Sequence, residues 1–185
     1  IYFLKIILKD LPFYLFIKML DVSGVLCWLF LLMNSVIFYK SYDLLDYNLS
    51  NNFIKYNEFD NNRKKYILTN ILKSFFLSII SVVFICNLYY GSIDLLDTSN
   101  WNSNIVFWKN LVAVYTSTDL IGLIKNKNMA TTTILHHYCV LIGFFVISLK
   151  DFKDEGIYKS IFIYGSFSSL AFLVNFYLGA RFLID

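Results

Sequence analysis

The feature that most constrains this chain is a series of long apolar runs. Val22 to Tyr39 is a stretch of 18 residues without a charge, and largely apolar runs follow at 67–90, 105–124, 131–149 and 158–182. A helix needs about 20 predominantly apolar residues to cross a bilayer. We therefore predict an all-α fold, a polytopic transmembrane helix bundle with at least five spans.

Composition agrees with a membrane protein and excludes other classes. The chain is 58% hydrophobic and only 16% charged, whereas soluble domains carry about 25% charged residues. One proline and seven glycines argue against a turn-rich β-protein, and the runs lack the alternation of a membrane β-barrel. The formal charge of +3 includes no large basic cluster, so we expect no nucleic-acid partner.

The flanking and connecting segments are more polar. Residues 1–20 mix apolar side chains with lysines around Pro12, which predicts an interfacial or partial membrane helix, with a short kinked span as the alternative. The transmembrane bundle then occupies 21–185. Residues 40–66 form the one long polar stretch and are expected to be a connecting loop. The chain starts at Ile1 and stops directly after an apolar run, so we expect it to be incomplete, at its C-terminal end in particular.

Three ionisable residues lie close together in segments otherwise suited to lipid. Asp119 lies six residues before Lys125, and His136 lies six residues after Ala130, across a short turn. At 1.5 Å per residue, both side chains are about 9 Å inside the same end of two neighbouring antiparallel helices. Ionisable groups at membrane depth are costly and mark candidate functional sites. We therefore expect Asp119 to meet one of the adjacent histidines, His136 or His137.

Three interpretations of this cluster remain open: a polar cluster that fixes helix packing, a site for a lipid headgroup or acyl chain, and a catalytic His–Asp pair. Tyr115 shares a helical face with Asp119, and Thr133 shares one with the histidines. A bound metal is not expected, because adjacent histidines lack the usual i, i+4 ligand spacing. The cysteines form no CxxC motif, which predicts neither a disulfide nor a thiolate metal site.

The same residues carry a resemblance to a known family. Tyr115-x-x-x-Asp119, a basic turn and then Thr133-Ile134-Leu135-His136-His137 resemble the core of the TLC (TRAM–LAG–CLN8) domain, a family of multi-pass membrane proteins. Asn62-Arg63-Lys64 is similar to the family's basic entry to a helix. The run from Ser166 to Leu170, with Asn175 and Arg181 after it, resembles the family's Glu-x-Ser-Thr segment and its trailing Asn and Arg. The TLC-like core covers about 60–185.

The chain also departs from the family pattern. The second span of the family often carries a histidine, whereas this chain has Lys73 and Ser74 there, and we expect Lys73 to extend to the membrane interface. Ser166 stands where the family has an acidic residue. The acidic motif that the ceramide synthase branch carries in a later helix is absent from the sequence.

The resemblance implies a lipid site and, in one branch of the family, chemistry. If the chain is an enzyme, it implies an acyl-CoA-dependent lipid N-acyltransferase in sphingolipid metabolism, with His136 or His137 as the general base and Asp119 as the orienting acid. The residues expected to contact lipid are Tyr115, Asp119, Thr133, His136, Ser166 and Asn175. No cofactor is expected beyond a bound phospholipid or acyl chain.

We predict a TLC-like integral membrane protein that binds or organises lipid, as a non-catalytic accessory or structural component of a membrane assembly. The N-acyltransferase is the alternative. The partners expected for this chain are membrane lipids and subunits of a large membrane complex. The resemblance favours the endoplasmic reticulum, and the mitochondrial inner membrane is the alternative.

Overall fold

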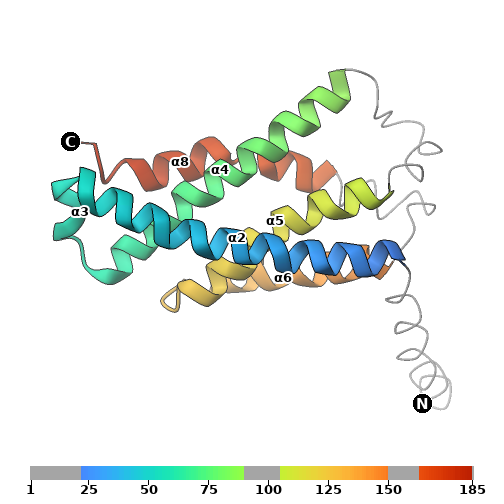
Figure 1. The fold of residues 1–185 in the computed structure, drawn as a ribbon, viewed down its shortest axis with the longest axis horizontal. Coiled ribbons are helices and arrows are strands. Elements are labelled where there is room, and N and C mark those ends of the chain that lie inside the picture. Colours follow the sequence, from blue (N-terminus) through green and yellow to red (C-terminus); the bar gives the residue numbers. More distant parts are fainter. Residues whose placement is uncertain (1–21, 90–104, 150–162, 185) are drawn as a thin grey trace, which may run out of the picture.

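The computed structural model describes residues 22–89, 105–149 and 163–184, and every regular element in these ranges is a helix (Figure 1). The predicted helix at 1–20 and the predicted turns at 91–104 and 150–156 lie outside the described residues. Residues 163–169 are helical and continue, after a turn at 170 and 171, into the last helix. The labelled helices are α2 (Val22–Asn52), α3 (Ile54–Glu58), α4 (Asn61–Tyr89), α5 (Ile105–Lys125), α6 (Thr131–Leu149) and α8 (Phe172–Ala180).

Four helical segments are long and apolar enough to cross a membrane: Gly24–Asn52, Asn61–Cys86, Thr131–Leu149 and Ile163–Ala180. The predicted all-α class is therefore confirmed, and the four segments are consistent with an integral membrane protein. The span predicted at 105–124 is helical, as α5, but is not one of these four. A count of at least five spans stays a prediction.

The prediction of a loop at 40–66 is wrong over most of its length. Helix α2 continues without a break to Asn52, and α4 already begins at Asn61. The continuation is stabilised by an apolar stripe at helical spacing, in which Phe38, Tyr42 and Leu49 are buried in one core cluster. Charged residues on the opposite side of the helix make this stretch polar on average, although its buried face is not.

Asp60 determines where α4 begins. Its Oδ1 accepts hydrogen bonds from the backbone amides of Asn62, at 2.8 Å, and Arg63, at 3.0 Å. These are the bonds of a helix N-cap, which satisfy amides that have no partner within the helix. The helix therefore starts six residues before the predicted apolar run at 67–90.

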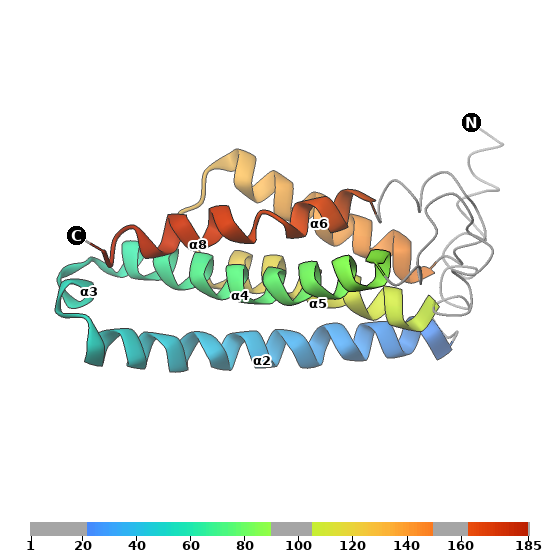
Figure 2. The same ribbon diagram turned by 90° about the horizontal axis from the view of Figure 1, so that it is seen from above.

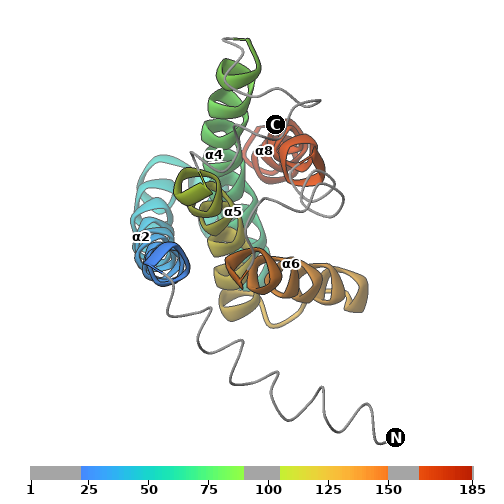
Figure 3. The ribbon, with the colours of Figure 1, turned by 90° about the vertical axis from the view of Figure 1, so that its right-hand side faces the viewer.

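The helices form three layers. Figures 2 and 3 show α2 on one side, α4 and α5 in the middle, and α6 and α8 on the other side. Helix α5 contacts α2, α4 and α6, whereas α8 packs on α4. The polar residues of α5 thus lie between the other helices.

Helix α8 approaches α4 closely at one glycine. A Cβ atom added at Gly179 would lie 2.6 Å from Cγ1 of Ile71 and 3.1 Å from the carbonyl oxygen of Ile67. Only a residue without a side chain fits at this distance, as at many helix–helix contacts in membranes. A hydrogen bond of 2.9 Å from Ser81 to Ser169 joins α4 to the preceding helical stretch.

Candidate functional site

Asp119 lies at the centre of a buried polar cluster that three helices share. Its side chain, on α5, is fully buried. One carboxylate oxygen, Oδ1, accepts a hydrogen bond from Lys73 Nζ on α4 at 2.5 Å, and Nδ1 of His137 on α6 lies 2.7 Å from the same oxygen. The expected meeting of Asp119 with one histidine is confirmed, and the histidine is His137.

The local sequence leaves Asp119 available to other helices. Thr116, Ser117 and Thr118 are fully buried beside it, but each hydroxyl donates to a carbonyl oxygen of α5 itself, at 2.7–2.8 Å. This back-bonding is common for hydroxyl residues within helices. The carboxylate therefore has its partners on α4 and α6, and the cluster connects three helices.

Of the two carboxylate oxygens of Asp119, only Oδ1 has hydrogen-bond partners among the described residues. An ionised carboxylate accepts hydrogen bonds and cannot donate them, so the contact with His137 requires a proton on Nδ1. The ammonium of Lys73 supplies the compensating charge that a buried carboxylate needs. The second oxygen, Oδ2, is buried and accepts no hydrogen bond from the described residues.

The two adjacent histidines have different environments. His137 is buried and bonded to Asp119, and its Cε1 and Nε2 lie 3.9 Å from the position of a Cβ added at Gly122. His136 is exposed, with its ring centroid 5.6 Å from that of His137. Side chains at consecutive helical positions point about 100° apart. Of the two histidines, only His136 lines a cavity that lies beside the cluster.

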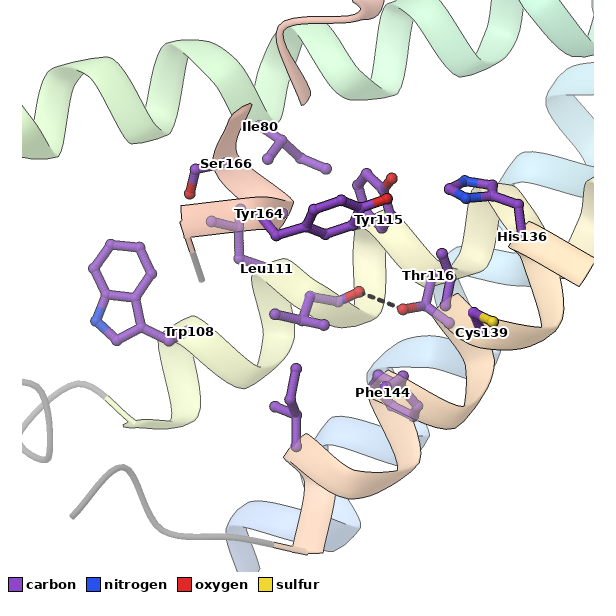
Figure 4. A pocket seen from close by; sticks show the side chains of 15 residues that line it. Ile80, Trp108, Leu111, Tyr115, Thr116, His136, Cys139, Phe144, Tyr164 and Ser166 are labelled. Atoms are coloured by element: carbon purple, nitrogen blue, oxygen red, sulfur yellow. Dashed lines mark hydrogen bonds between the residues drawn. The ribbon is translucent and has the colours of Figure 1, made fainter. Parts of the chain in front are cut away.

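This cavity has a volume of about 250 Å³ and lies between α4, α5, α6 and the helical stretch that starts at 163 (Figure 4). Figure 4 shows Trp108 towards one end and His136 towards the other. Trp108 and Thr116 are eight residues apart on α5, so the cavity follows this helix for about 12 Å. Its lining comprises Ile80, Trp108, Leu111, Val112, Tyr115, Thr116, His136, Cys139, Val140, Gly143, Phe144, Ile147, Tyr164, Gly165 and Ser166.

Most of this lining is apolar. Its polar side chains include Tyr115, Thr116, His136, Tyr164 and Ser166. Figure 4 shows Tyr115, Thr116 and His136 on the same side of the cavity, with Ser166 nearer Trp108. Apolar walls with a few polar groups are typical of small-molecule and lipid sites. The cavity can therefore hold an apolar chain with a polar group beside His136.

Asp119, His136 and His137 also offer ligand atoms for a cation, all within 4.8 Å of one another. Imidazole nitrogens and a carboxylate are the donor types that zinc and similar ions prefer. Here, however, the positive ammonium of Lys73 contacts the carboxylate oxygen that would share the ion. The charge of Lys73 opposes a divalent cation at these three residues.

The structure brings together some of the predicted site residues and separates others. Tyr115, His136 and Ser166 line the cavity, and a carboxylate oxygen of Asp119 lies within 4.8 Å of a ring nitrogen of His136. Thr133 is exposed at the start of α6, and the Asn175 amide donates to the carbonyl oxygen of Ala171 within its own helix. Neither Thr133 nor Asn175 lines the cavity.

The residue that the sequence interpretation missed is Lys73. It was expected to extend to the membrane interface, but its side chain is only 14% exposed and contacts Asp119 inside the bundle. The correction has a physical reason: a buried carboxylate attracts the nearest cation of a neighbouring helix. The available signal was its place in the second span, where the resembling family often carries a histidine.

No protein-family model, curated protein sequence or solved structure matches this chain. The cavity and the polar cluster are therefore the features of this chain that bear on its function.

Proposed function

We propose that this chain is an integral membrane protein that binds a lipid acyl chain between its helices, as a non-catalytic component that holds or organises lipid. The observation that carries the proposal is the cavity of about 250 Å³, which is apolar along its length and polar beside His136. An acyl chain matches the apolar walls. The ester or amide at its polar end matches the polar groups near His136.

The position of the cavity supports a lipid over a water-soluble ligand. Three of its walls, α4, α6 and the helical stretch from 163, belong to segments that are long and apolar enough to cross a membrane. Their outer faces carry large exposed apolar side chains, such as Leu135, Ile142 and Phe167. A hydrophobic ligand reaches such a site from the bilayer.

We further propose that the chain is TLC-like. Support comes from four residues of the resembling motif, Tyr115, Asp119, His136 and His137, which belong to two neighbouring helices and gather at one end of one cavity. Under this proposal the protein resides in the endoplasmic reticulum, with the mitochondrial inner membrane as the alternative.

Two glycines make the lipid proposal testable. Gly143 and Gly165 line the cavity, and a Cβ atom added at either one has no atom of another described residue within 4 Å. Gly143→Phe therefore fills the cavity without forcing the backbone apart. The adjacent Ile142 is 63% exposed and does not line the cavity, so Ile142→Phe is the matched control.

The measurement is the lipid content of protein purified in mild detergent, determined by native mass spectrometry and lipid extraction. We expect an acyl lipid bound to the original chain and to Ile142→Phe, and its loss from Gly143→Phe. Equal lipid content in both variants would overturn the proposal. The accessory role is tested in the same preparation on a native gel. A large multi-subunit band is the result expected of an accessory component, and migration as a free monomer would contradict the accessory role.

A lipid N-acyltransferase is the second candidate, and one observation favours it. His136 is at once a lining residue of the cavity and within 4.8 Å of Asp119 and His137, so an imidazole lies where the polar end of a bound acyl group would be. A general base must lie within hydrogen-bond reach of the proton that it removes. In this candidate mechanism His136 is the base, whereas His137 and Asp119 are positioning residues.

The two candidates differ in a direct assay. Reconstituted protein would be given a long-chain acyl-CoA and a sphingoid base, and the amide product measured by mass spectrometry. Turnover that His136→Ala abolishes, with lipid content and expression unchanged, supports the enzyme. Absence of turnover in the original chain, together with a bound acyl lipid, supports the non-catalytic role.

A further inference from the structure

A second site lies at the N-terminal end of α4, about 15 Å along the helix from Lys73. It is an open surface pocket lined by Asp60, Asn62, Arg63, Tyr66, Arg181 and Phe182. It contains both arginines of the chain, which are 118 residues apart in the sequence. The folding of α8 onto α4 brings them together, and the cavity described above does not include them.

Aromatic rings hold the two arginines. The Cζ atoms of Arg63 and Arg181 lie 5.4 Å and 4.7 Å from the centroid of the Phe182 ring. Both distances are within the range of a cation–π interaction. A guanidinium placed on an aromatic face keeps its N–H groups free to donate in its own plane, which is the geometry that binds phosphate.

The charge of this pocket is not balanced by ion pairs. Among the described residues, neither arginine forms an ion pair. Among the described residues that line the pocket, Asp60 is the one acidic residue, and its Oδ1 accepts two backbone N–H bonds at the start of α4. The two guanidinium groups and the one carboxylate give the described lining of the pocket a net positive charge.

The pocket lies at the ends of two helical segments that are long and apolar enough to cross a membrane. Arg63 is two residues inside the segment Asn61–Cys86, and Arg181 directly follows the segment Ile163–Ala180, both of which can cross a membrane. Basic residues at such helix ends face the phosphates of the bilayer surface. Arg63 and Arg181 are both exposed, so a headgroup can reach them.

We propose that Arg63 and Arg181 bind the phosphate group of an anionic lipid at this end of the bundle, with the Phe182 ring holding both guanidinium groups in place. The site is separate from the acyl-chain cavity, and either can exist without the other. Free phosphate has the same chemistry, so the experiment must distinguish the two sources.

The test is a binding titration by native mass spectrometry in mixed micelles, with phosphatidylglycerol against phosphatidylcholine of the same acyl chains. We expect the original chain to prefer phosphatidylglycerol. Arg63→Gln/Arg181→Gln should weaken that binding by about tenfold or more, because two hydrogen bonds between charged groups are lost. Lys65 lies at the same helix end but does not line the pocket. Lys65→Gln, which also removes one positive charge, should change the binding by less than about twofold.

Asp60→Asn gives a change in the opposite direction. Asparagine is also a good N-cap residue, so α4 should begin as before while the opposing charge disappears. We expect tighter phosphatidylglycerol binding. Retained folding of each variant is checked by circular dichroism during heating.

The outcomes are distinct. No preference for phosphatidylglycerol, or equal losses in Lys65→Gln and the arginine variants, would overturn the site. Inorganic phosphate that displaces the lipid at millimolar concentration identifies free phosphate as a ligand, and phosphate without effect identifies the lipid. Repeating the titration in Gly143→Phe separates this site from the cavity, because the arginine-dependent binding should persist there.

Discussion

Lys73 and Asp119 are 46 residues apart in the sequence and belong to different helices, yet Lys73 Nζ lies 2.5 Å from Asp119 Oδ1. Asp119 is fully buried and Lys73 nearly so. An isolated carboxylate at this position would be strongly destabilising, because charge is costly in a medium of low dielectric constant. The pair therefore makes the packing of α4 on α5 a condition for a stable Asp119.

Removing one member of this pair should be more harmful than removing both charges. We expect Lys73→Met to lower the free energy of unfolding by about 3 kcal/mol, since it leaves a buried carboxylate without its cation. Lys73→Met/Asp119→Asn should recover part of this loss, and a double-mutant cycle from unfolding in detergent gives the coupling. Asp43→Asn, which breaks the exposed pair of Asp43 with Lys125, is the control and should change stability by less than about 1 kcal/mol. A Lys73→Met loss no larger than that of the control would contradict the prediction.

The sequence was most informative where apolar runs were long and charges few. Helices α5 and α6 follow the predicted ranges 105–124 and 131–149 closely, because the turn between them is polar and short. The matched depth of Asp119 and a histidine followed from the same turn. What periodicity could not decide was which histidine faces Asp119, since adjacent positions on a helix differ by about 100° and the rotation of α6 depends on its packing.

The errors also have physical causes. The extension of α2 to Asn52 depends on a buried apolar stripe that includes Tyr42 and Leu49. This stripe is hard to recognise in the sequence, because charged residues lie between its members. The position of Lys73 depends on a contact between helices, and snorkelling to the interface is the ordinary expectation for a lysine near a helix end. Long-range pairing of this kind cannot be read from one helix alone.

The two histidines should behave differently when each is replaced. His137→Ala removes a hydrogen bond from the buried carboxylate of Asp119 and should lower the free energy of unfolding by about 1–3 kcal/mol. His136→Ala changes an exposed residue that forms no hydrogen bond with the described residues, and should change the free energy of unfolding by no more than about 0.5 kcal/mol. Thermal unfolding in detergent measures both. A larger loss for His136→Ala than for His137→Ala would reverse the assignment.

The pH dependence of stability should include a contribution from Asp60. Its pKa is held below the usual value of an aspartate, mainly by the backbone hydrogen bond from Arg63, with a further bond from Asn62. Because the folded pKa is lower than the unfolded one, this contribution is fully present above the unfolded pKa and disappears as pH falls through the folded pKa. Thermal midpoints measured between pH 3 and pH 7 should show the original chain above Asp60→Ala at neutral pH, with the gap closing at the acid end. A gap that does not depend on pH would contradict the role of the ionised carboxylate.

Gly179 offers the sharpest test of how α8 packs on α4. A methyl group at this position would lie 2.6 Å from Cγ1 of Ile71 and within 3.2 Å of its backbone nitrogen, so α8 must shift away from α4. We expect Gly179→Ala to lower the free energy of unfolding by about 1–3 kcal/mol, the usual range for overpacking. Gly165→Ala is the matched control in the same part of the chain, because a Cβ there has no neighbour within 4 Å in the part of the chain that the structure describes. The shift also moves Arg181 relative to Arg63, so Gly179→Ala should weaken phosphatidylglycerol binding while Gly165→Ala leaves it unchanged. Equal stability of the two variants would show that α8 does not pack on α4 at this glycine.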